Sequence, residues 1–485
     1  MTNSYENLTP HLVFKYFAEI SKIPRGSGNE KAISDYLVGF AKERGLQVIQ
    51  DKAWNVIIKK PGTSGYEKAP TVIIQGHMDM VCDKNKDTVH DFEKDPIKLR
   101  IEGDMLYASD TTLGADDGIA VAYGLALLDS DDIPHPPLEI LMTVEEEVGL
   151  NGAAVLDTKE LKGRLLINID SEEDDKLLVG CAGGVRVKEY LPISWENAKA
   201  GMLPCNISIK GLFGGHSGAE IHRGRGNSNK LMGRLLNDLS LDLEYYIREI
   251  NGGLKMNAIP REAEVVILIN PADYSKLEAN IHKWDSTFKN ELRVSDPGVS
   301  INVEKISRQI DSVFSRETAK KAVASLILIP SGVQTMSMDI EGLTESSTNL
   351  GVVITSDNEI CFENAARSSV RSLKYNIFNQ IKMVADTLGA RFEPDSDYPE
   401  WEYNPNSKLR SLFIDVYKRK YGSEPGIVMV HGGVECGLFG EKMPGIDMVS
   451  IGANMYDVHT PKEHISISSI GKTWEYLLEV LKEIK

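Results

Sequence analysis

The residues best suited to chemistry begin with His77 and Asp79, which follow the apolar run Thr71–Ile74. An apolar, β-branched run of this length after a proline predicts a buried strand, and open α/β sheets bind ligands at such strand ends. In extended backbone, residues two apart face the same side, so Asp79 could hold the imidazole of His77 while the other ring nitrogen binds a metal. One such pair predicts a fragment of a metal site.

Further carboxylates lie beside other predicted elements. They are Glu145, Glu146 and Glu147 after the apolar run 138–144, Asp170 after the run 165–169, and Asp116 and Asp117 before the helical run 119–128. Asp116 and Asp117 have a second explanation, because the helix dipole favours carboxylates at a helix N-terminus. Strands that alternate with helices favour a mostly parallel sheet, in which the carboxyl ends of the strands share one edge. We therefore expect these acids to meet near His77.

A second imidazole stands far along the chain. His459 follows the predicted strand Val449–Ile451 and could reach the same sheet edge. The combined set mixes nitrogen and oxygen donors and holds no cysteine, which favours zinc, with cobalt or manganese as alternatives. The sequence has no HExxH, Walker A or GxSxG motif, and no dinucleotide-binding fingerprint. The candidate donors are His77, Asp116, Glu147, Asp170 and His459.

Composition narrows the class of protein. With 42% hydrophobic and 26% charged residues, the 485-residue chain is typical of a soluble globular protein, and its length predicts more than one domain. Its net charge of −17 argues against binding to nucleic acid or to an anionic membrane surface. Five scattered cysteines without a CxxC pair fit a reducing compartment, and the polar N-terminus predicts no signal peptide. The longest apolar run is about half of a bilayer span, so we expect a cytoplasmic protein.

The hydrophobic pattern changes twice along the chain. Up to about residue 185 it predicts α/β structure, whereas later strands such as Cys205–Lys210 alternate polar and apolar residues, as an antiparallel sheet with one solvated face requires. After Pro394 the α/β pattern resumes. We therefore predict an α/β catalytic domain with a mostly parallel central sheet in residues 1–185 and 394–485, interrupted by an α+β insert in residues 186–393. The insert repeats the order helix, strands, helix, as a duplication would produce.

Motifs spread along nearly the whole chain resemble those of one family. They are Gln75–Cys82, Thr111–Gly118, Thr143–Gly152, Asn168–Glu172, Gly180–Gly184, Gly214–Lys230, Asn257–Ala263, His431–Phe439 and His459–Glu463. Together they are similar to the co-catalytic di-zinc peptidase family that includes aminoacylases, carboxypeptidase G2 and dipeptidases, with the aminoacyl-histidine dipeptidases as the nearest likeness. Thr460 and Lys462 stand where such proteins often have Ser and Asp, and Glu145 where Asp is common. None of these departures removes a candidate donor.

The resemblance implies a role for each donor. Asp116 would bridge a pair of zinc ions. His77 and Asp170 would complete the site of one ion, and Glu147 and His459 the site of the other.

The same resemblance assigns two neighbouring carboxylates. Asp79 would orient the ring of His77, and Glu146 would take a proton from the attacking water and return it to the leaving amine. Because extended backbone would point Glu146 and Glu147 in opposite directions, different roles for the two make chemical sense. The family also implies a cis peptide bond between residues 116 and 117.

For the insert, the resemblance implies a lid domain that carries substrate contacts. His216, in a glycine-rich turn, would stabilise the oxyanion or bind the substrate carboxylate. Asn257 would hold the peptide carbonyl and Arg367 the terminal carboxylate, which a planar guanidinium suits. Gly433 and Glu435 would line the pocket, with Glu435 as an anchor for the substrate ammonium.

The residue type at position 170 indicates the class of substrate. In the family, aspartate at this ligand position accompanies aminopeptidase or dipeptidase activity, whereas glutamate accompanies carboxypeptidases and aminoacylases. We therefore expect hydrolysis of unblocked dipeptides, preferentially Xaa-His and carnosine-like ones, by a monomer or homodimer that holds Zn²⁺. The alternatives are a broader dipeptidase or tripeptidase, an N-acyl-amino-acid hydrolase on the same scaffold, and an inactive peptide-binding homologue.

Overall fold

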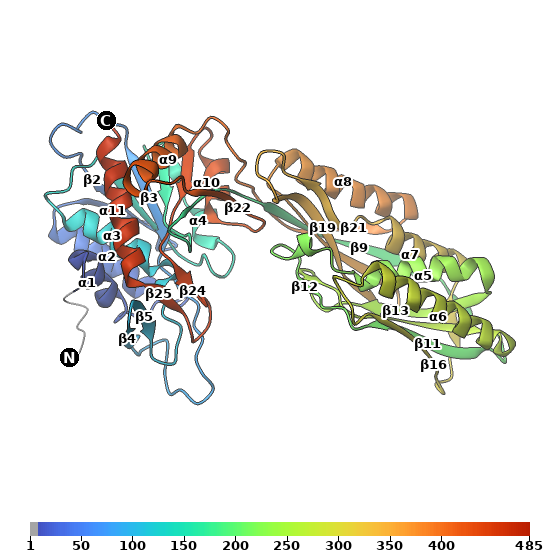
Figure 1. The fold of residues 1–485 in the computed structure, drawn as a ribbon. Coiled ribbons are helices and arrows are strands. Elements are labelled where there is room, and N and C mark those ends of the chain that lie inside the picture. Colours follow the sequence, from blue (N-terminus) through green and yellow to red (C-terminus); the bar gives the residue numbers. More distant parts are fainter. Residues whose placement is uncertain (1–7) are drawn as a thin grey trace. The chain divides into compact units, whose positions relative to one another are not determined.

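The computed structural model describes residues 8–485, which divide into two compact units (Figure 1). Unit 1 consists of residues 8–180, 403–429 and 434–485, and unit 2 of residues 181–402 and 430–433. The first division therefore lies five residues before the predicted one at 185. The second moves from 393 to 402, because strand β21 (Arg391–Tyr398) pairs with β9 (Gly183–Pro192) and so belongs to the sheet of unit 2.

Unit 1 is built on a mixed sheet with a parallel centre, as the sequence predicted. Within the described residues its strand order is β1-β2-β6-β3-β7-β23-β8-β22, and β6, β3, β7 and β23 run parallel to one another. Every residue of β3 and β6 is buried, which explains their nearly continuous apolar sequences. The strands are β1 Gln47–Gln50, β2 Val56–Lys60, β3 Val72–His77, β6 Leu138–Thr143, β7 Leu165–Asn168, β8 Lys176–Cys181, β22 Gly426–Val430 and β23 Asp447–Ser450.

Helix α3 (Ala115–Asp129) is the central helix of unit 1, because it is apolar on all sides and buried along nearly its whole length. It packs on β3 and on α1 (His11–Ile20). Its Tyr123 ring lies 5.5 Å from that of Trp474 in α11 (Ile467–Glu483), so the last helix of the chain packs beside it (Figure 1). The remaining helices of unit 1 are α2 Lys31–Glu43, α4 Asn151–Val155, the 3₁₀ turn η2 Thr158–Glu160, α9 Lys408–Tyr421 and α10 Glu435–Lys442.

A small second sheet in unit 1 fixes the segment that carries His459. Its order is β24-β25-β5-β4, with β24 Met455–Tyr456, β25 His464–Ser466, β5 Met105–Ala108 and β4 Leu99–Glu102. Strand β25 pairs with both β24 and β5. The loop 457–463 is therefore held at both of its ends.

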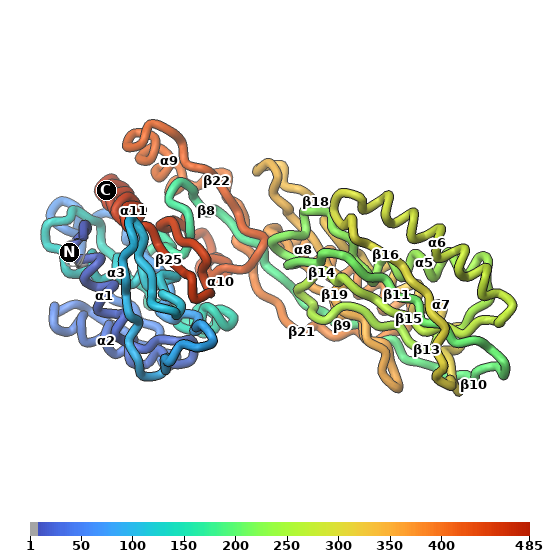
Figure 2. Tube along the Cα trace, turned by 60° about the horizontal axis from the view of Figure 1, so that its bottom comes forward, coloured from blue at the N-terminus to red at the C-terminus, as the bar shows by residue number. Residues whose placement is uncertain are grey.

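Unit 2 is organised around an antiparallel sheet, as predicted for the insert (Figure 2). The order is β16-β11-β15-β13-β19-β20-β9-β21, and β18 also pairs with β19. Two short ladders, β10 with β17 and β12 with β14, lie outside this sheet. The further strands are β10 Trp195–Asn197, β11 Leu203–Lys210, β12 Gly215–His216, β13 Tyr245–Gly252, β14 Ala258–Ile259, β15 Ala263–Ile269, β16 Ser300–Lys305, β17 Ser312–Phe314, β18 Gly332–Met336, β19 Thr344–Thr355 and β20 Glu359–Ser368.

Four helices cover one face of the unit 2 sheet within the described part of the chain. Helix α5 contacts β15 and β19, while α8 contacts β9 and β20. Apolar side chains between these layers, such as Leu235, Ile267 and Phe362, form the core of unit 2. The helices are α5 Ser228–Asp242, α6 Tyr274–Glu291, α7 Arg316–Leu328 and α8 Arg371–Leu388, with 3₁₀ turns η3 Ile221–Arg223 and η4 Pro271–Asp273.

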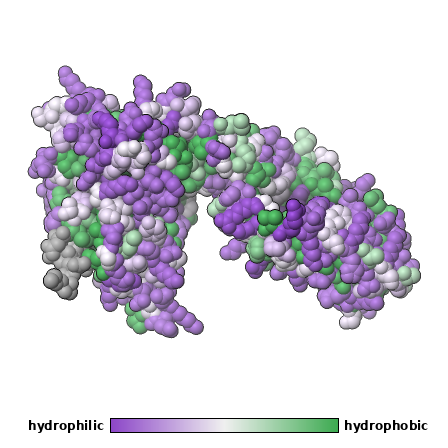
Figure 3. Space-filling model, viewed as in Figure 1, coloured by the Kyte–Doolittle hydropathy of each residue, from purple (hydrophilic) through white to green (hydrophobic). Residues whose placement is uncertain are grey.

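The surface is polar over most of the face that Figure 3 shows, with hydrophobic residues scattered between hydrophilic ones. Among residues 8–485, no helix combines the length and the apolar character needed to cross a bilayer.

Candidate metal centre

The five predicted donors converge at the carboxyl edge of the parallel strands of unit 1. His77 is the last residue of β3, Glu147 follows β6 and Asp170 follows β7. Because these strands are parallel neighbours, their ends bring the three side chains together. Asp116 joins them from the first turn of α3, and His459 from the loop between β24 and β25.

The donor atoms form two groups that share Asp116. Nε2 of His77 lies 3.1 Å from Oδ1 of Asp116 and 3.7 Å from Oδ1 of Asp170. Nε2 of His459 lies 3.2 Å from Oδ2 of Asp116 and 3.0 Å from the Glu147 carboxylate. In each group, the donor atoms lie within 4.8 Å of one another. Asp116 thus offers one oxygen to each group, as a bridging carboxylate would.

Asp79 connects the end of β3 to the turn after β6. Its Oδ1 lies 3.3 Å from Nδ1 of His77. The same carboxylate accepts the backbone N–H groups of Glu146 at 3.1 Å and Glu147 at 3.3 Å, and the hydroxyl of Ser27 at 2.8 Å. Burial alone would raise the pKa of Asp79, but the contact with His77 keeps that pKa below its ordinary value. The side chain is therefore placed to hold both the His77 ring and the backbone of the acidic turn.

Glu146 and Glu147 do not point in opposite directions, and that expectation is wrong. It assumed extended backbone, but Glu145 has a φ of 50°, in the left-handed region, and the chain turns after β6. The N–H of Glu145 is held by Oε1 of Glu30 at 3.1 Å. Both carboxylates consequently reach His77, with one oxygen of each and a ring nitrogen within 4.8 Å of one another.

The start of α3 approaches β3 closely. The peptide bond between Asp116 and Asp117 is cis, as the resemblance implied. Oδ2 of Asp117 accepts the backbone N–H of His77 at 3.2 Å. A Cβ at Gly76 would overlap this oxygen and the side chain of Ala120, so glycine is required for the helix to come this near.

Carboxylates dominate the electrostatics of the cluster. Burial would lower the pKa of His77, but Asp116, Asp170 and Asp79 together raise it well above its ordinary value. Hydrogen bonds to Asp116 and Glu147 raise the pKa of His459 to about 10. Burial raises the pKa of Glu146 to about 9, against the charge of His77, which lowers it. The cluster therefore stabilises positive charge at its centre.

The donor set fits a pair of divalent cations. Donors that bind one tetrahedral zinc ion at ~2.0–2.2 Å lie about 3.3–3.6 Å from one another, and the imidazole-to-carboxylate distances here run from 3.0 to 3.7 Å. Imidazole and carboxylate donors without thiolate suit zinc, cobalt or manganese.

Glu435, the predicted anchor for the substrate ammonium, is buried at the start of α10 in unit 1, with its side chain 0% exposed. One carboxylate oxygen accepts hydrogen bonds from Nε2 of Gln75 at 2.5 Å and from Oγ1 of Thr143 at 2.8 Å, and Gln75 in turn accepts one from Asn168 at 2.7 Å. Glu435 belongs to a buried polar network under the ends of β3, β6 and β7, and its second carboxylate oxygen, Oε1, is buried without a hydrogen-bond partner. Its role as an anchor for the substrate ammonium stays a prediction.

In unit 2, His216 and Asn257 are neighbours. Strands β12 and β14 pair His216 with Ala258, and the N–H of Ser217 donates to the carbonyl of Asn257 at 2.9 Å. Nδ1 of His216 accepts the N–H groups of Gly218 and Ala219 at 3.2 and 3.0 Å. The ring proton is thus assigned to Nε2, which is left as a donor. Both residues line a cavity of about 620 Å³ in unit 2.

Arg367 lies on β20 of unit 2, near enough to His216 that, in addition to burial, its charge lowers the pKa of that imidazole. Its Nη1 donates to the Tyr398 hydroxyl at 2.7 Å, and its buried Nε has no hydrogen-bond partner. Gly433 makes room for this arrangement, because a Cβ there would lie 2.7 Å from the Tyr398 ring. Opposite Arg367, Ser347 contacts Nε2 of His431 at 2.7 Å. Burial, followed by the charge of Arg367, lowers the pKa of His431 to about 4, so this imidazole is neutral.

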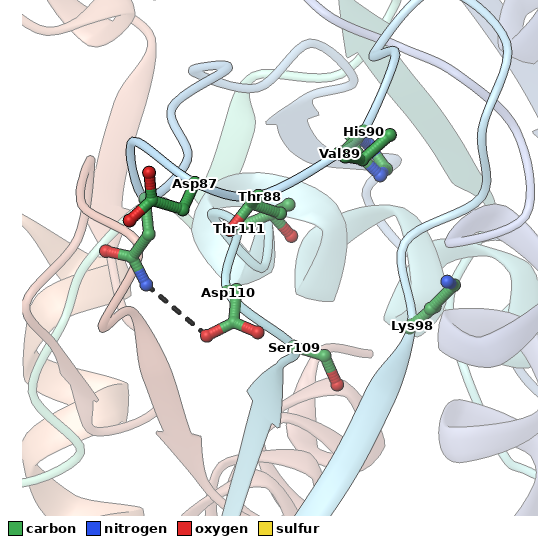
Figure 4. A pocket seen from close by; sticks show the side chains of 9 residues that line it. Asp87, Thr88, Val89, His90, Lys98, Ser109, Asp110 and Thr111 are labelled. Carbon is green, nitrogen blue, oxygen red and sulfur yellow. Dashed lines mark hydrogen bonds between the residues drawn. The ribbon is translucent and has the colours of Figure 1, made fainter.

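A polar hollow of about 450 Å³ lies beside the loop that follows β3 (Figure 4). Asn85, Asp87, Thr88, Val89, His90 and Lys98 line this hollow together with Ser109, Asp110 and Thr111. Asn85 donates to Asp110 at 3.4 Å, the dashed line in Figure 4. None of the five candidate donors lines this hollow, so it is separate from the metal cluster.

Sequence reasoning overlooked two buried charges beside the cluster, Arg25 and Glu463. Arg25 is 2% exposed and Glu463 is 3% exposed. Glu463 stands four residues after His459, and that spacing is the one signal in the sequence that pointed to it.

An α/β unit that gathers imidazoles and carboxylates at the carboxyl edge of its parallel strands, joined to an antiparallel α+β unit, has the architecture of a metal-dependent hydrolase. Comparison with known proteins makes the assignment specific. Residues 73–483 match the family described as Peptidase family M20/M25/M40. The chain belongs to this peptidase family.

Individual relatives agree with the family match. The chain is 38% identical over 479 residues to the cytosol non-specific dipeptidase of Escherichia coli K12, covering 98% of both chains. It is 37% identical to the aminoacylhistidine dipeptidase of Vibrio alginolyticus, whose crystal structure matches with a TM-score of 0.96 over 100% of this chain and 98% of that one. The aminopeptidase PepT of Bacillus cereus shares the fold, with a TM-score of 0.56 at 16% identity over 98% of this chain and 99% of that one.

Proposed function

We propose that this protein is a metal-dependent dipeptidase that hydrolyses unblocked dipeptides, Xaa-His among them, in the cytoplasm. The observation that carries the proposal is the pair of donor groups that share Asp116, with the Glu146 carboxylate beside them. Two relatives of at least 37% identity, which match over nearly their whole length, are named as dipeptidases, one as a cytosol non-specific dipeptidase and the other as an aminoacylhistidine dipeptidase.

His77, Asp116 and Asp170 would hold one cation, and Asp116, Glu147 and His459 the other. When bound, a pair of Zn²⁺ ions, or of Co²⁺ or Mn²⁺ ions, supplies Lewis-acid polarisation of the scissile carbonyl and lowers the pKa of water. Asp79 keeps the ring of His77 oriented, since its carboxylate lies against Nδ1.

Glu146 is the proposed general base. Burial raises the pKa of its side chain, and cations bound beside it would favour the ionised form. The carboxylate takes a proton from the attacking water and returns it to the nitrogen of the leaving amine. The backbone N–H of Glu146 is held by Asp79 at 3.1 Å, so the residue that orients His77 also fixes the position of the base. Both roles then depend on one carboxylate.

Side chains of unit 2 are proposed to bind the peptide. The Nε2–H of His216 donates to the carbonyl oxygen as negative charge develops there. Burial, followed by the charge of Arg367, lowers the pKa of His216, which keeps the imidazole neutral and its Nδ1 free to accept the two backbone N–H groups. Asn257, its neighbour, binds the same peptide group.

Arg367 is proposed to bind the free C-terminal carboxylate. The unpartnered Nε is a donor that a carboxylate would satisfy, and Tyr398 fixes the guanidinium through Nη1. Gly433 contributes by leaving the space that Tyr398 occupies. A carboxylate bound in this way would set the number of residues after the scissile bond, whereas a limit on the amino side of the substrate needs a separate contact.

Turnover of alanyl-histidine, alanyl-alanine, trialanine, alanyl-histidinamide and an N-acetylated amino acid by the zinc-loaded protein tests this proposal. We expect hydrolysis of both free dipeptides and weak or no hydrolysis of the amide. Preference for the acetylated compound would establish the N-acyl-amino-acid hydrolase instead, and turnover of tripeptides at equal rates would establish a broader peptidase. Inactivity on every compound with both cations bound would favour the peptide-binding homologue.

A further inference from the structure

Glu463 joins the turn that carries Asp116 to the loop that carries His459. Its Oε2 accepts the backbone N–H groups of Leu113 at 2.7 Å and Gly114 at 3.0 Å. Its Oε1 accepts those of Ala115 at 2.7 Å and Asp116 at 3.5 Å. One buried carboxylate thus binds a run of consecutive amides directly before and at the shared donor.

Arg25 holds the opposite side of the same turn. Its Nη2 donates to the carbonyl of Gly114, whose N–H is bound by Glu463. Its Nη1 donates to the carbonyls of Met78 and Asp79, both at 3.1 Å. The turn with Asp116 is consequently tied through Glu463 to the His459 loop and through Arg25 to the segment after His77.

The His459 loop needs such a support. His459 has a φ of 63° and Asp457 a φ of 51°, left-handed conformations that are uncommon in non-glycine residues and persist when the surroundings impose them. Glu463 is fixed next to β25, whose His464 pairs with Tyr107 of β5. Its hydrogen bonds to the turn therefore anchor the loop at its β25 end, four residues after His459.

We propose that Glu463 is a positioning residue, which sets the distance between His459 and Asp116 so that the donor group Asp116, Glu147 and His459 is formed before a cation binds. This inference rests on the proposed metal centre and adds to it a residue that touches neither cation nor substrate. The expected consequence is selective. Binding at the group that contains His459 depends on Glu463 more strongly than binding at the group of His77, Asp116 and Asp170.

The Glu463→Gln variant is the test, because it keeps the shape of the side chain but replaces one acceptor oxygen by an NH₂ donor that faces backbone N–H groups. The metal-free protein is titrated with Co²⁺, and binding is monitored by calorimetry and by the visible spectrum of the bound ion. The titration gives a separate affinity for the first and for the second Co²⁺ equivalent. Loss of a residue that positions a metal ligand costs ~10–100-fold in affinity. We expect a loss of this size for one equivalent and a change of less than threefold for the other.

Glu139 provides a matched control. It is a buried glutamate at the amino end of β6, and its carboxylate accepts the backbone N–H groups of Lys162 and Gly163 at 2.9 and 3.0 Å. Glu139→Gln should lower the thermal midpoint of the metal-free protein as Glu463→Gln does, since both leave amides badly paired. It should leave both Co²⁺ equivalents as in the wild type.

The outcomes separate this inference from the proposal beneath it. A wild type that binds no cation overturns the metal centre, and this role of Glu463 with it. A wild type that binds a pair of cations, with Glu463→Gln binding them as tightly, overturns the positioning role alone. If Glu463→Gln does not fold, Glu463→Asp decides, because it keeps the charge and shortens the reach: weaker binding of one equivalent supports the role, and wild-type binding refutes it.

Discussion

The Nε2 atom of His459 lies 3.2 Å from Oδ2 of Asp116, although 343 residues separate the two in the chain. Oδ1 of the same carboxylate lies 3.1 Å from Nε2 of His77. One side chain therefore faces an imidazole on each of its oxygens. This arrangement requires that the two ends of unit 1 fold together before a complete site exists.

Alanine at His459 and alanine at Asp116 should lower the metal content to different extents. We expect the wild type to retain about two Zn²⁺ ions per chain after dialysis, His459→Ala about one, and Asp116→Ala fewer than His459→Ala, because Asp116 serves both groups. Elemental analysis measures this. Asp87→Asn, in the hollow of Figure 4, is the control and should match the wild type. Equal metal content in His459→Ala and the wild type would contradict the shared-carboxylate arrangement.

Glu146→Gln should abolish proton transfer without emptying the site. Because the amide cannot take a proton from water, kcat should fall ~10²–10⁴-fold, while the zinc content stays as in the wild type. Glu145→Gln is the control, since the neighbouring carboxylate accepts from Asn151 at 3.0 Å and lies outside the donor groups. Steady-state kinetics with alanyl-histidine, combined with elemental analysis, measures both. A Glu146→Gln enzyme with wild-type kcat would remove this residue from the mechanism.

The donors could be predicted from the sequence because each stands beside a strongly patterned element. His77 and Asp170 follow apolar strands, and Asp116 precedes an apolar helix, so elementary rules place all three at one sheet edge. The direction of Glu146 could not be predicted, since it depends on the left-handed backbone of Glu145, which pattern rules assign to glycine or asparagine. Secondary-structure propensities do not indicate that a glutamate will adopt a left-handed backbone conformation.

Polar contacts between residues far apart in the chain could not be predicted from the sequence either. Glu463 binds amides about 350 residues away, and a glutamate in a loop normally predicts a solvated side chain. Glu435 was expected to line the substrate pocket, and its burial beside Gln75 and Thr143, which donate to one of its two carboxylate oxygens, could not be predicted from its position in the sequence. The end of the insert was placed too early because β21 is a solvent-facing edge strand whose polar residues resemble a linker.

His216→Ala should lower kcat and leave the metal content unchanged. If the Nε2–H stabilises developing charge on the carbonyl oxygen, its loss costs ~10²–10³-fold in kcat. His222→Ala is the control, because this second histidine lies in η3 of the same unit and is exposed. A fall in zinc content instead of kcat would identify His216 as a metal ligand, against the present assignment.

Gly76→Ala should destabilise unit 1 and weaken metal binding together. The new methyl group would collide with Ala120 and Asp117, which separates α3 from β3 and costs ~1–3 kcal/mol of overpacking. Gly39→Ala in α2 is the control: a Cβ there meets nothing within 4 Å, so alanine should stabilise the helix by ~0.5–1 kcal/mol. Thermal midpoints of the metal-free proteins and Co²⁺ titrations measure both effects. Unchanged Co²⁺ binding in Gly76→Ala would show that the β3–α3 approach does not position the donors.

Glu189 should make the stability of unit 2 depend on pH. The side chain is 0% exposed and has one hydrogen-bond partner, the Ser325 hydroxyl at 2.9 Å. Burial raises its pKa from 4.5 to about 7, so the folded state holds the proton more tightly than the unfolded state. The stabilisation is complete below pH 4.5 and is lost as the pH rises through about 7.

Glu189→Gln removes this titration and keeps the shape of the side chain. As the pH rises from 5 to 8, the unfolding free energy of the wild type should fall relative to that of the variant by an amount on the order of 1–3 kcal/mol. Urea midpoints at several pH values measure the difference, with Glu264→Gln as the control, because Glu264 is exposed on β15 and pairs with Lys210 at 3.2 Å. Parallel pH profiles for wild type and Glu189→Gln would mean that Glu189 is ionised in the folded core, and that a charge partner compensates its burial.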